Sequence, residues 1–80
     1  MKESQIISGI TKVLKENLKL QDLDIKRGMQ AYDVEGWDSL AHIGIIISLE
    51  EEFKLRFSIG EISKVENIGE LIDLIKKKKS

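Results

Sequence analysis

Residues 39 to about 54 carry an apolar arc that constrains the fold more than any other feature of the chain. At 100° per residue, one arc holds Leu40, Ile43, Ile45, Ile46, Ile47, Leu49 and Phe53. That arc covers well over half of the helix circumference, which is more than a helix facing a single core needs. The sequence therefore predicts the central helix of a small bundle, with one edge, chiefly Leu40 and Ile47, exposed for a partner.

The composition agrees with a small helical domain. The chain has 80 residues, no proline and many Ile, Leu, Lys and Glu residues, which favours helices joined by short loops. We expect a single domain over residues 1–80 with a modest core. Cysteine is absent and His42 is the one histidine, so the sequence offers neither a disulfide, a thiolate nucleophile nor a His-rich zinc site. With no glycine-rich phosphate loop either, an enzyme is not expected.

Three further segments have helical patterns, so we predict an all-α, four-helix bundle with three longer helices and one short third helix. The first helix spans residues 4–20, with Ser4 as a candidate N-cap. Ser58 and Glu61 have capping-box spacing and open the short helix, which continues through Val65. Asn67 and Glu70 repeat that spacing at the start of the last helix. Its apolar face is Ile68, Leu71, Ile72 and Ile75.

The connection between the first two helices, residues 21–38, has no sustained period. Connections of this length are uncommon unless they pack on the core or serve a function. Five apolar residues lie within it: Leu23, Ile25, Met29, Tyr32 and Val34. We therefore predict an ordered loop whose apolar side chains dock against the helices.

Charge is unevenly distributed, although the formal net charge is only -1. Residues 38–70 hold seven acidic and three basic residues, a net charge of -4. This acidic middle suits basic protein partners and argues against nucleic acid binding. The run of four lysines at 76–79 could touch anionic lipid, but we expect a frayed solubilising tail.

The start of the chain does not resemble a secretory signal. The first residues are polar and no long apolar segment follows them, unlike a signal peptide. The longest apolar runs are far too short to span a bilayer. We expect a soluble cytoplasmic protein with no membrane insertion.

Ser39 stands where the long loop ends and the central helix begins. A serine at a helix start projects its hydroxyl from the helix end, and the helix dipole favours a phosphodiester anion there. Asp38 is well placed to bind a metal ion or a basic group on a modifying enzyme. Leu40 offers an apolar contact for that enzyme just after Ser39. The alternative is that Ser39 is only an N-cap, a common role for serine.

The stretch Gly36-Trp37-Asp38-Ser39-Leu40, followed by a helix that ends Leu49-Glu50-Glu51-Glu52-Phe53 and by a short third helix, resembles the acyl carrier proteins. The resemblance extends over essentially the whole chain and is clearest from residue 34 to residue 57. It implies that Ser39 carries a covalent 4′-phosphopantetheine arm. Asp38 and Leu40 would complete the attachment motif.

The same resemblance implies roles for other residues of the central helix. Glu50 and Glu51 would pair with basic patches on partner enzymes, and Ile47 would be an exposed apolar partner contact. The residues implied to line a core that opens for an acyl chain are Ile45, Leu49, Phe53 and Ile62. The implied partners of this monomeric carrier are a phosphopantetheinyl transferase and acyl-transferring or acyl-ligating enzymes.

Some residues depart from the pattern of bulk fatty acid carriers. Acids are usual where this chain has Ala41 and Gly44, and Trp37 is commoner in specialised or aminoacyl carriers. We interpret Trp37 as a hydrophobic anchor for the loop, while His42 adds a group that can gain charge near neutral pH. A free-standing acyl carrier of a specialised pathway is the leading interpretation. The alternatives are an aminoacyl carrier, for example of D-alanine, and an unmodified helical interaction module.

Overall fold

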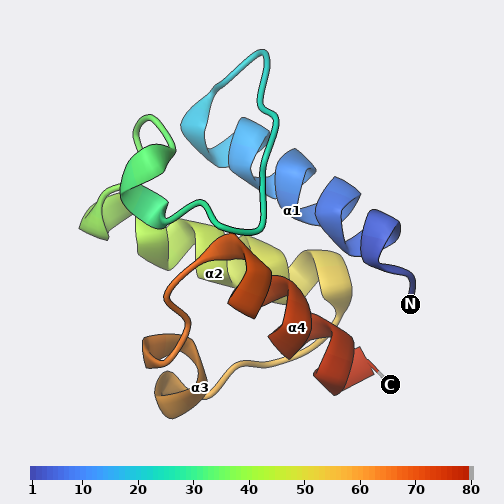
Figure 1. Ribbon diagram of the computed structural model, residues 1–80. Helices are drawn as coiled ribbons and strands as arrows, with labels where there is room; N and C mark the ends of the chain where they lie inside the picture. The colour runs from blue at the N-terminus through green and yellow to red at the C-terminus, as the bar shows by residue number, and fades with distance from the viewer. Residues whose placement is uncertain (80) are drawn as a thin grey trace.

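The computed structural model describes residues 1–79 and has the predicted helical order (Figure 1). Its elements are α1 (Glu3–Leu18), a 3-10 turn η1 (Ala31–Asp33), α2 (Ser39–Phe53), α3 (Ile59–Ser63) and α4 (Ile68–Lys79). No strand occurs between residues 1 and 79. The all-α fold with three longer helices and a short third one is therefore confirmed.

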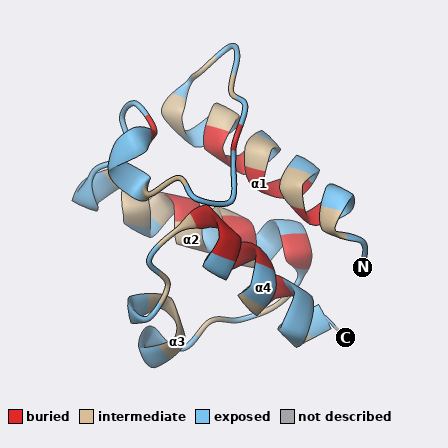
Figure 2. Ribbon diagram, viewed as in Figure 1, coloured by how far each residue is buried: buried red, intermediate tan, exposed pale blue. Residues whose placement is uncertain are grey.

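One core joins the three longer helices, and Figure 2 shows their buried faces turned toward one another. Its fully buried members include Ile6, Ile10 and Leu14 from α1, Ile45 and Leu49 from α2, and Ile68, Ile72 and Ile75 from α4. Within each helix these residues recur at spacings of three, four or seven, so each helix presents one face inward. The short α3 has no buried residue and lies at the rim of the bundle.

A glycine sets how closely α1 approaches α2. Gly9 is buried in α1, and a Cβ atom built on it would overlap the ring of Phe53. Phe53 itself is 4% exposed at the end of α2. The ring therefore packs directly on the α1 backbone, which only glycine permits at this distance.

The long loop is ordered, as predicted, and most of its apolar residues pack inward. Ile25 and Val34 are buried, while Leu23 and Met29 pack on the core. The prediction is wrong for Tyr32, which is 80% exposed. Tyr32 is the middle residue of the 3-10 turn η1, which turns its ring to the outside while Val34 takes the inward position.

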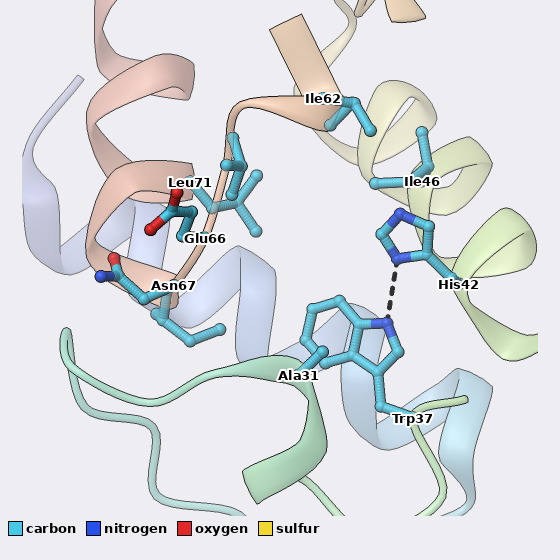
Figure 3. Close-up of a pocket in the computed structure, with 10 residues that line it drawn as sticks. Ala31, Trp37, His42, Ile46, Ile62, Glu66, Asn67 and Leu71 are labelled. Atoms are coloured by element: carbon cyan, nitrogen blue, oxygen red, sulfur yellow. Dashed lines mark hydrogen bonds between the residues drawn. The ribbon is translucent and has the colours of Figure 1, made fainter. Parts of the chain in front are cut away.

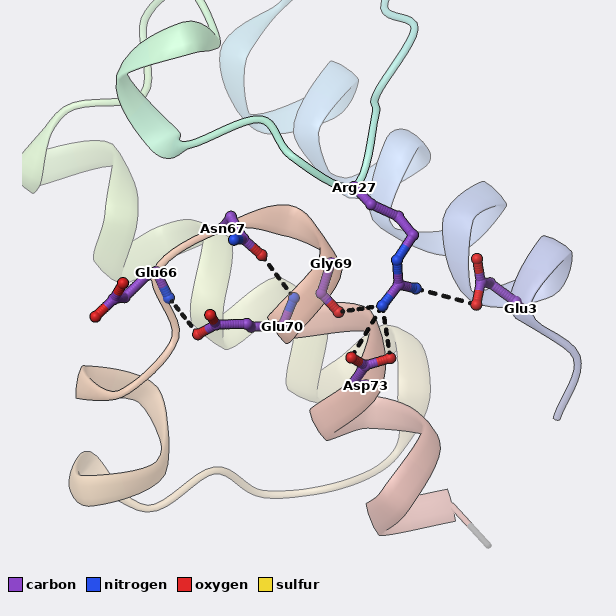
Figure 4. Close-up of polar contacts among 7 residues, drawn as sticks. All are labelled: Glu3, Arg27, Glu66, Asn67, Gly69, Glu70 and Asp73. Atoms are coloured by element: carbon purple, nitrogen blue, oxygen red, sulfur yellow. Dashed lines mark hydrogen bonds and ion pairs between the residues drawn. The ribbon is translucent and has the colours of Figure 1, made fainter.

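The loop is fastened to the start of α4 through its backbone and through Arg27. The amides of Ile68 and Gly69 donate to the carbonyls of Met29 (2.8 Å) and Arg27 (2.7 Å). The Arg27 guanidinium donates to Asp73 at 2.9 Å and to Glu3 at 3.1 Å, which ties α4 to α1 (Figure 4). The hydrogen bond with Asp73 is the main reason why the pKa of Arg27 is raised above its ordinary value.

The helix ends correct three details of the sequence prediction. The first helix begins one residue after Lys2, whose amide donates to Gln5 Oε1 at 2.9 Å, so Ser4 is not its N-cap. That helix ends at Leu18 because Lys19 adopts a left-handed conformation with φ 55°. The C-terminal lysines are helical through Lys79 rather than frayed, and Lys78 pairs with Glu61 at 2.9 Å.

The capping pattern is confirmed at α3 and modified at α4. In α3 the Glu61 amide donates to Ser58 Oγ at 3.0 Å, and the Ser58 amide donates to Glu61 Oε1 at 2.9 Å; the helix ends at Ser63, short of Val65. In α4 the Glu70 amide donates to Asn67 Oδ1 at 2.8 Å. The Glu70 carboxylate, however, accepts from the amide of Glu66 at 3.0 Å instead of that of Asn67 (Figure 4).

This capping predicts a pH dependence of stability at the rim. The hydrogen bond from the Ser58 amide, followed by that from Lys78, lowers the pKa of Glu61 below its ordinary value of 4.5. A lowered folded-state pKa contributes stability above the unfolded-state value and loses it as the pH falls through the folded-state value. Glu61→Gln should therefore lower the Tm at neutral pH, and this deficit should shrink as the pH falls below 4.5. Thermal melts across that range test it, with Glu16→Gln on α1 as the control; a deficit independent of pH would contradict it.

Candidate attachment and docking site

Ser39 is the first residue of α2 and is exposed. The N-cap is Asp38, whose Oδ1 accepts a hydrogen bond from the Ala41 amide at 2.8 Å. The interpretation of Ser39 as the cap is therefore wrong. Within residues 1–79 no hydrogen bond engages the Ser39 hydroxyl. The helix start is stabilised by its neighbour, and the hydroxyl stays available for chemistry.

The turn before α2 fixes the position of this hydroxyl. Gly36 has φ +86°, a left-handed conformation that favours glycine. The Trp37 amide donates to the Val34 carbonyl at 3.1 Å, and the Asp38 amide donates to Gly36 at 3.0 Å. Val34 is buried and Trp37 packs against the core, so the turn that leads to Ser39 is held at both residues.

The electrostatics of the junction suit an anionic attachment. The N-terminal end of a helix carries a partial positive charge and unpaired amides, which stabilise a phosphate group nearby. Asp38 is exposed beside Ser39, with one carboxylate oxygen engaged by the Ala41 amide. No hydrogen bond of its second oxygen is found within residues 1–79. Residues 1–79 contain no group of three or more His, Cys, Asp or Glu side chains that could hold a metal ion.

An apolar stripe leads away from the junction along α2. Leu40 is 84% exposed, Ile43 63% and Ile47 52%. The spacings of three and four residues place all three on one side of the helix. The predicted exposure of Leu40 and Ile47 is confirmed, and Ile43 extends the same surface.

The three acids at the end of α2 differ in how they are held. Glu50 is half-buried, and its Oε2 accepts from the Phe57 amide at 2.9 Å, so it fastens the chain after α2. Glu52 pairs with Lys12 of α1 at 3.3 Å. Glu51 is exposed, and no ion pair or hydrogen bond of its side chain is found within residues 1–79. It is the acid most available to a partner.

The residues expected to line an acyl-binding core fall into two groups. Ile45, Leu49 and Phe53 are buried among the helices. Ile62 instead lines a pocket enclosed by α2, α3 and the beginning of α4. From α2 this pocket receives His42 and Ile46, whose involvement the sequence analysis did not foresee.

Trp37 and His42 form one wall of that pocket (Figure 3). The indole Nε1–H donates to His42 Nδ1 at 3.1 Å, and the rings stack with centroids 6.0 Å apart. Trp37 is half-buried against the core, which agrees with its expected role as a loop anchor. In the sequence, the only sign of this pairing is that Trp37 precedes His42 by five residues, with the start of α2 between them. Two residues at that spacing across a helix start have no fixed relative position, so the sequence does not predict the pairing.

No helix within residues 1–79 is long and apolar enough to cross a membrane.

Comparisons with known proteins agree with this geometry. Residues 8–75 match the family model described as "Phosphopantetheine attachment site". The chain is 35% identical over 69 residues to the acyl carrier protein of Buchnera aphidicola subsp. Acyrthosiphon pisum (strain Tuc7), covering 86% of each protein. It is 23% identical over 74 residues to the acyl carrier protein of Thermotoga maritima, covering 92% of this chain and 91% of that one.

A solved structure shows the same fold. The solution NMR structure of the holo acyl carrier protein from Geobacter metallireducens superimposes with a TM-score of 0.83 at 34% sequence identity. The match covers 91% of this chain and 84% of that one. With a family model matched over most of the chain and relatives aligned along nearly their whole length, the chain belongs to the acyl carrier protein family, whose members carry a covalent 4′-phosphopantetheine arm.

Proposed function

We propose that Ser39 is the attachment residue and that the arm on it carries acyl thioesters between biosynthetic enzymes. The observation that carries this assignment is the exposed Ser39 hydroxyl at the start of α2, left without a partner because Asp38 performs the capping. The hydrogen-bonded turn before it and the positive helix end behind it support a phosphodiester at this position. Asp38 and Leu40 complete the motif that a transferase would recognise.

The attachment reaction forms one bond to phosphorus and breaks another. The Ser39 oxygen attacks the phosphorus of coenzyme A that bears the pantetheine, and its proton passes to a base on the transferase. The new P–O bond forms as the pyrophosphate bond breaks, which releases adenosine 3′,5′-bisphosphate. The Asp38 carboxylate would attract the metal ion or basic group that the transferase brings to this phosphate.

The carrier itself supplies positioning and not catalysis. A tethered thioester reaches each partner active site at a high effective concentration. We place this monomeric carrier in the cytoplasm, where coenzyme A and acyl-activating enzymes are available. A mass gain of one phosphopantetheinyl group on incubation with a broad-specificity transferase and coenzyme A tests the proposal. The absence of any gain would favour the unmodified interaction module.

Loading assays distinguish a carrier of amino acids from a carrier of fatty acyl groups. The holo protein can be offered to an acyl-chain ligase with fatty acids and to an adenylating enzyme with amino acids, including D-alanine. We expect acyl loading. Loading by amino acids alone would assign the chain to the aminoacyl carriers.

The docking surface in this proposal consists of Leu40, Ile43, Ile47 and Glu51. The apolar stripe supplies contact area next to the reaction point, and the acid steers basic partner surfaces. Glu50 is adjacent, but its carboxylate also holds the Phe57 amide, so its loss would alter the chain after α2.

Charge reversal at Glu51 should slow loading without harming the fold. We expect Glu51→Lys to reduce kcat/KM with the transferase about three- to tenfold at low salt, because a favourable charge contact becomes a repulsive one. The effect should shrink at high salt as screening increases. Glu16→Lys makes the same charge change on the outer face of α1 and should leave kcat/KM unchanged. Equal effects of the two variants would mean that net charge, and not the α2 surface, governs docking.

A further inference from the structure

The end of α2 presents fewer acids to a partner than its sequence suggests. Glu50 Oε2 accepts from the Phe57 amide at 2.9 Å, and Glu52 pairs with Lys12 at 3.3 Å. Of the three consecutive acids, Glu51 alone has neither a hydrogen bond nor an ion pair of its side chain within residues 1–79. A partner therefore meets one unpaired carboxylate at this end of the helix.

Two cations follow this carboxylate directly. Lys54 is the C-cap of α2, in a left-handed conformation with φ 54°, and Arg56 lies two residues further along. Both are exposed, and within residues 1–79 neither side chain has a hydrogen bond or an ion pair, not even with Glu51. The unpaired side-chain charges at the end of α2 are therefore two positive and one negative. We call Lys54 and Arg56 the positive end.

The neighbouring residues turn the positive end outward. Leu55 and Phe57, on either side of Arg56, pack against the core. The Leu55 amide donates to the Glu50 carbonyl at 3.1 Å, and the Phe57 amide donates to the Glu50 carboxylate. The backbone on both sides of Arg56 is thus fastened to the last turn of α2. Glu50 acts here as a positioning residue for the cation that follows it.

The positive end is continuous with the docking surface. Both cations line a surface groove together with Ile47 and Glu51, which belong to that surface. Lys54 follows Ile47 by seven residues, about two helical turns, so it continues the same side of the helix. At 1.5 Å per residue, Glu51 lies about 18 Å and Lys54 about 22 Å from Ser39 along the helix axis.

Stabilisation of the helix explains only part of this arrangement. A cation in the last turn interacts favourably with the negative end of the helix dipole, and this effect falls off beyond that turn. Lys54 is in a position to contribute in this way. Arg56 lies outside the helix and does not cap it, so its exposed and unpaired charge is left for an interaction with another molecule.

We propose that the positive end selects partner enzymes that carry carboxylates opposite it and disfavours enzymes whose docking face is basic throughout. This inference rests on the proposed function, because it concerns enzymes that act on the arm. Charge complementarity then requires a basic group on the partner about 18 Å from the entrance for the arm, opposite Glu51, and carboxylates about 22 Å from it. Two like charges facing each other are repulsive, which lets the same cations reject the wrong partner.

A malonyl transferase whose docking face is basic is a suitable probe, since it moves malonyl from coenzyme A to the arm of a holo carrier. It is used in its parent form and in a reversed form, in which Glu replaces the basic side chains about 20–25 Å from the entrance for the arm. Every carrier is converted to the holo form and confirmed by intact mass beforehand, so a failure to attach the arm would count against the proposed function separately. The measurement is kcat/KM at low salt.

Reversing the charge of the positive end should have opposite effects with the two forms of the probe. For the double variant Lys54→Glu, Arg56→Glu we expect kcat/KM to rise about three- to tenfold with the parent form and to fall by a similar factor with the reversed form. Lys54→Gln, Arg56→Gln should give smaller changes in the same directions without adding acids to the helix end. Both effects should shrink at high salt. The control Lys15→Glu, Lys26→Glu makes the same net charge change on α1 and the long loop and should change neither value.

Several outcomes would overturn the proposal. One is an unchanged kcat/KM of the charge-reversed carrier with both forms of the probe; a lowered Tm of that carrier would then assign Lys54 to the helix dipole alone. Another is an equal effect of the control variant, which would mean that net charge governs the encounter. Absence of turnover by both forms with every holo carrier would also count against it, because charge at this end would then not be what excludes the probe.

Discussion

Ser39→Ala will abolish phosphopantetheine attachment, and intact-mass measurement after incubation with transferase and coenzyme A will show only the unmodified chain. The expected loss is complete because the serine oxygen is the atom that forms the new bond to phosphorus. The fold should be unaffected, since Ser39 is exposed and Asp38 caps α2. We expect its free energy of unfolding to stay within about 0.5 kcal/mol of the parent value, as is usual for surface substitutions.

Two controls make that result specific to the position. Ser8→Ala, at an exposed site on α1, removes a hydroxyl elsewhere and should load like the parent. Asp38→Asn keeps an oxygen for the Ala41 amide but removes the charge, so α2 should remain capped while loading slows. A mass gain on Ser39→Ala would place the arm on another residue and refute the assignment.

The largest effect on stability is expected at the contact between α1 and α2. Gly9→Ala adds a Cβ atom that overlaps the Phe53 ring, and that ring is too deeply buried to move freely. Overpacking of this kind costs about 1–3 kcal/mol. Alanine also favours a helix over glycine by about 1 kcal/mol, so the clash has to be measured against a matched substitution.

Gly60→Ala is that matched substitution. Gly60 lies in α3, and a Cβ atom added there meets nothing within 4 Å. Denaturant unfolding should show Gly9→Ala less stable than Gly60→Ala by about 1–3 kcal/mol. Combining Gly9→Ala with Phe53→Leu should recover part of the loss, because the shorter side chain leaves room for the methyl group. Equal stability of the two alanine variants would mean that α1 and α2 can move apart without loss of stability, which would contradict the prediction.

Local patterns predicted the helices well and singled out the candidate attachment motif. The apolar arc of α2 identified a central helix, and its two ends agree with the structure because they depend on neighbouring residues. The capping box of Ser58 and Glu61 was found for the same reason. The prediction was less accurate at Ser4 and at Tyr32. An N-cap position and an inward-facing loop residue both depend on how the backbone turns locally, and residues 21–38 have no period that fixes this.

In the candidate site, too, the sequence identified residues but not the contacts that they make. Sequence singled out Ser39, Asp38 and Leu40, but it could not decide which of Ser39 and Asp38 caps the helix, since both side chains are good caps. It also grouped Glu50, Glu51 and Glu52 together. In the structure Glu50 holds the Phe57 amide and Glu52 pairs with α1, which leaves Glu51 open.

By itself, the sequence determined the helix order, the family and the serine that we assign to the arm, because periodicity and short motifs act over a few neighbouring residues. Only the tertiary structure decided that the Gly9 backbone contacts Phe53, that Arg27 joins the loop to two helices, and that Trp37 and His42 close a small pocket with α3 and α4. Each of these contacts joins residues on different elements. Their distances are set by how the whole core packs, and no local pattern of residues encodes that.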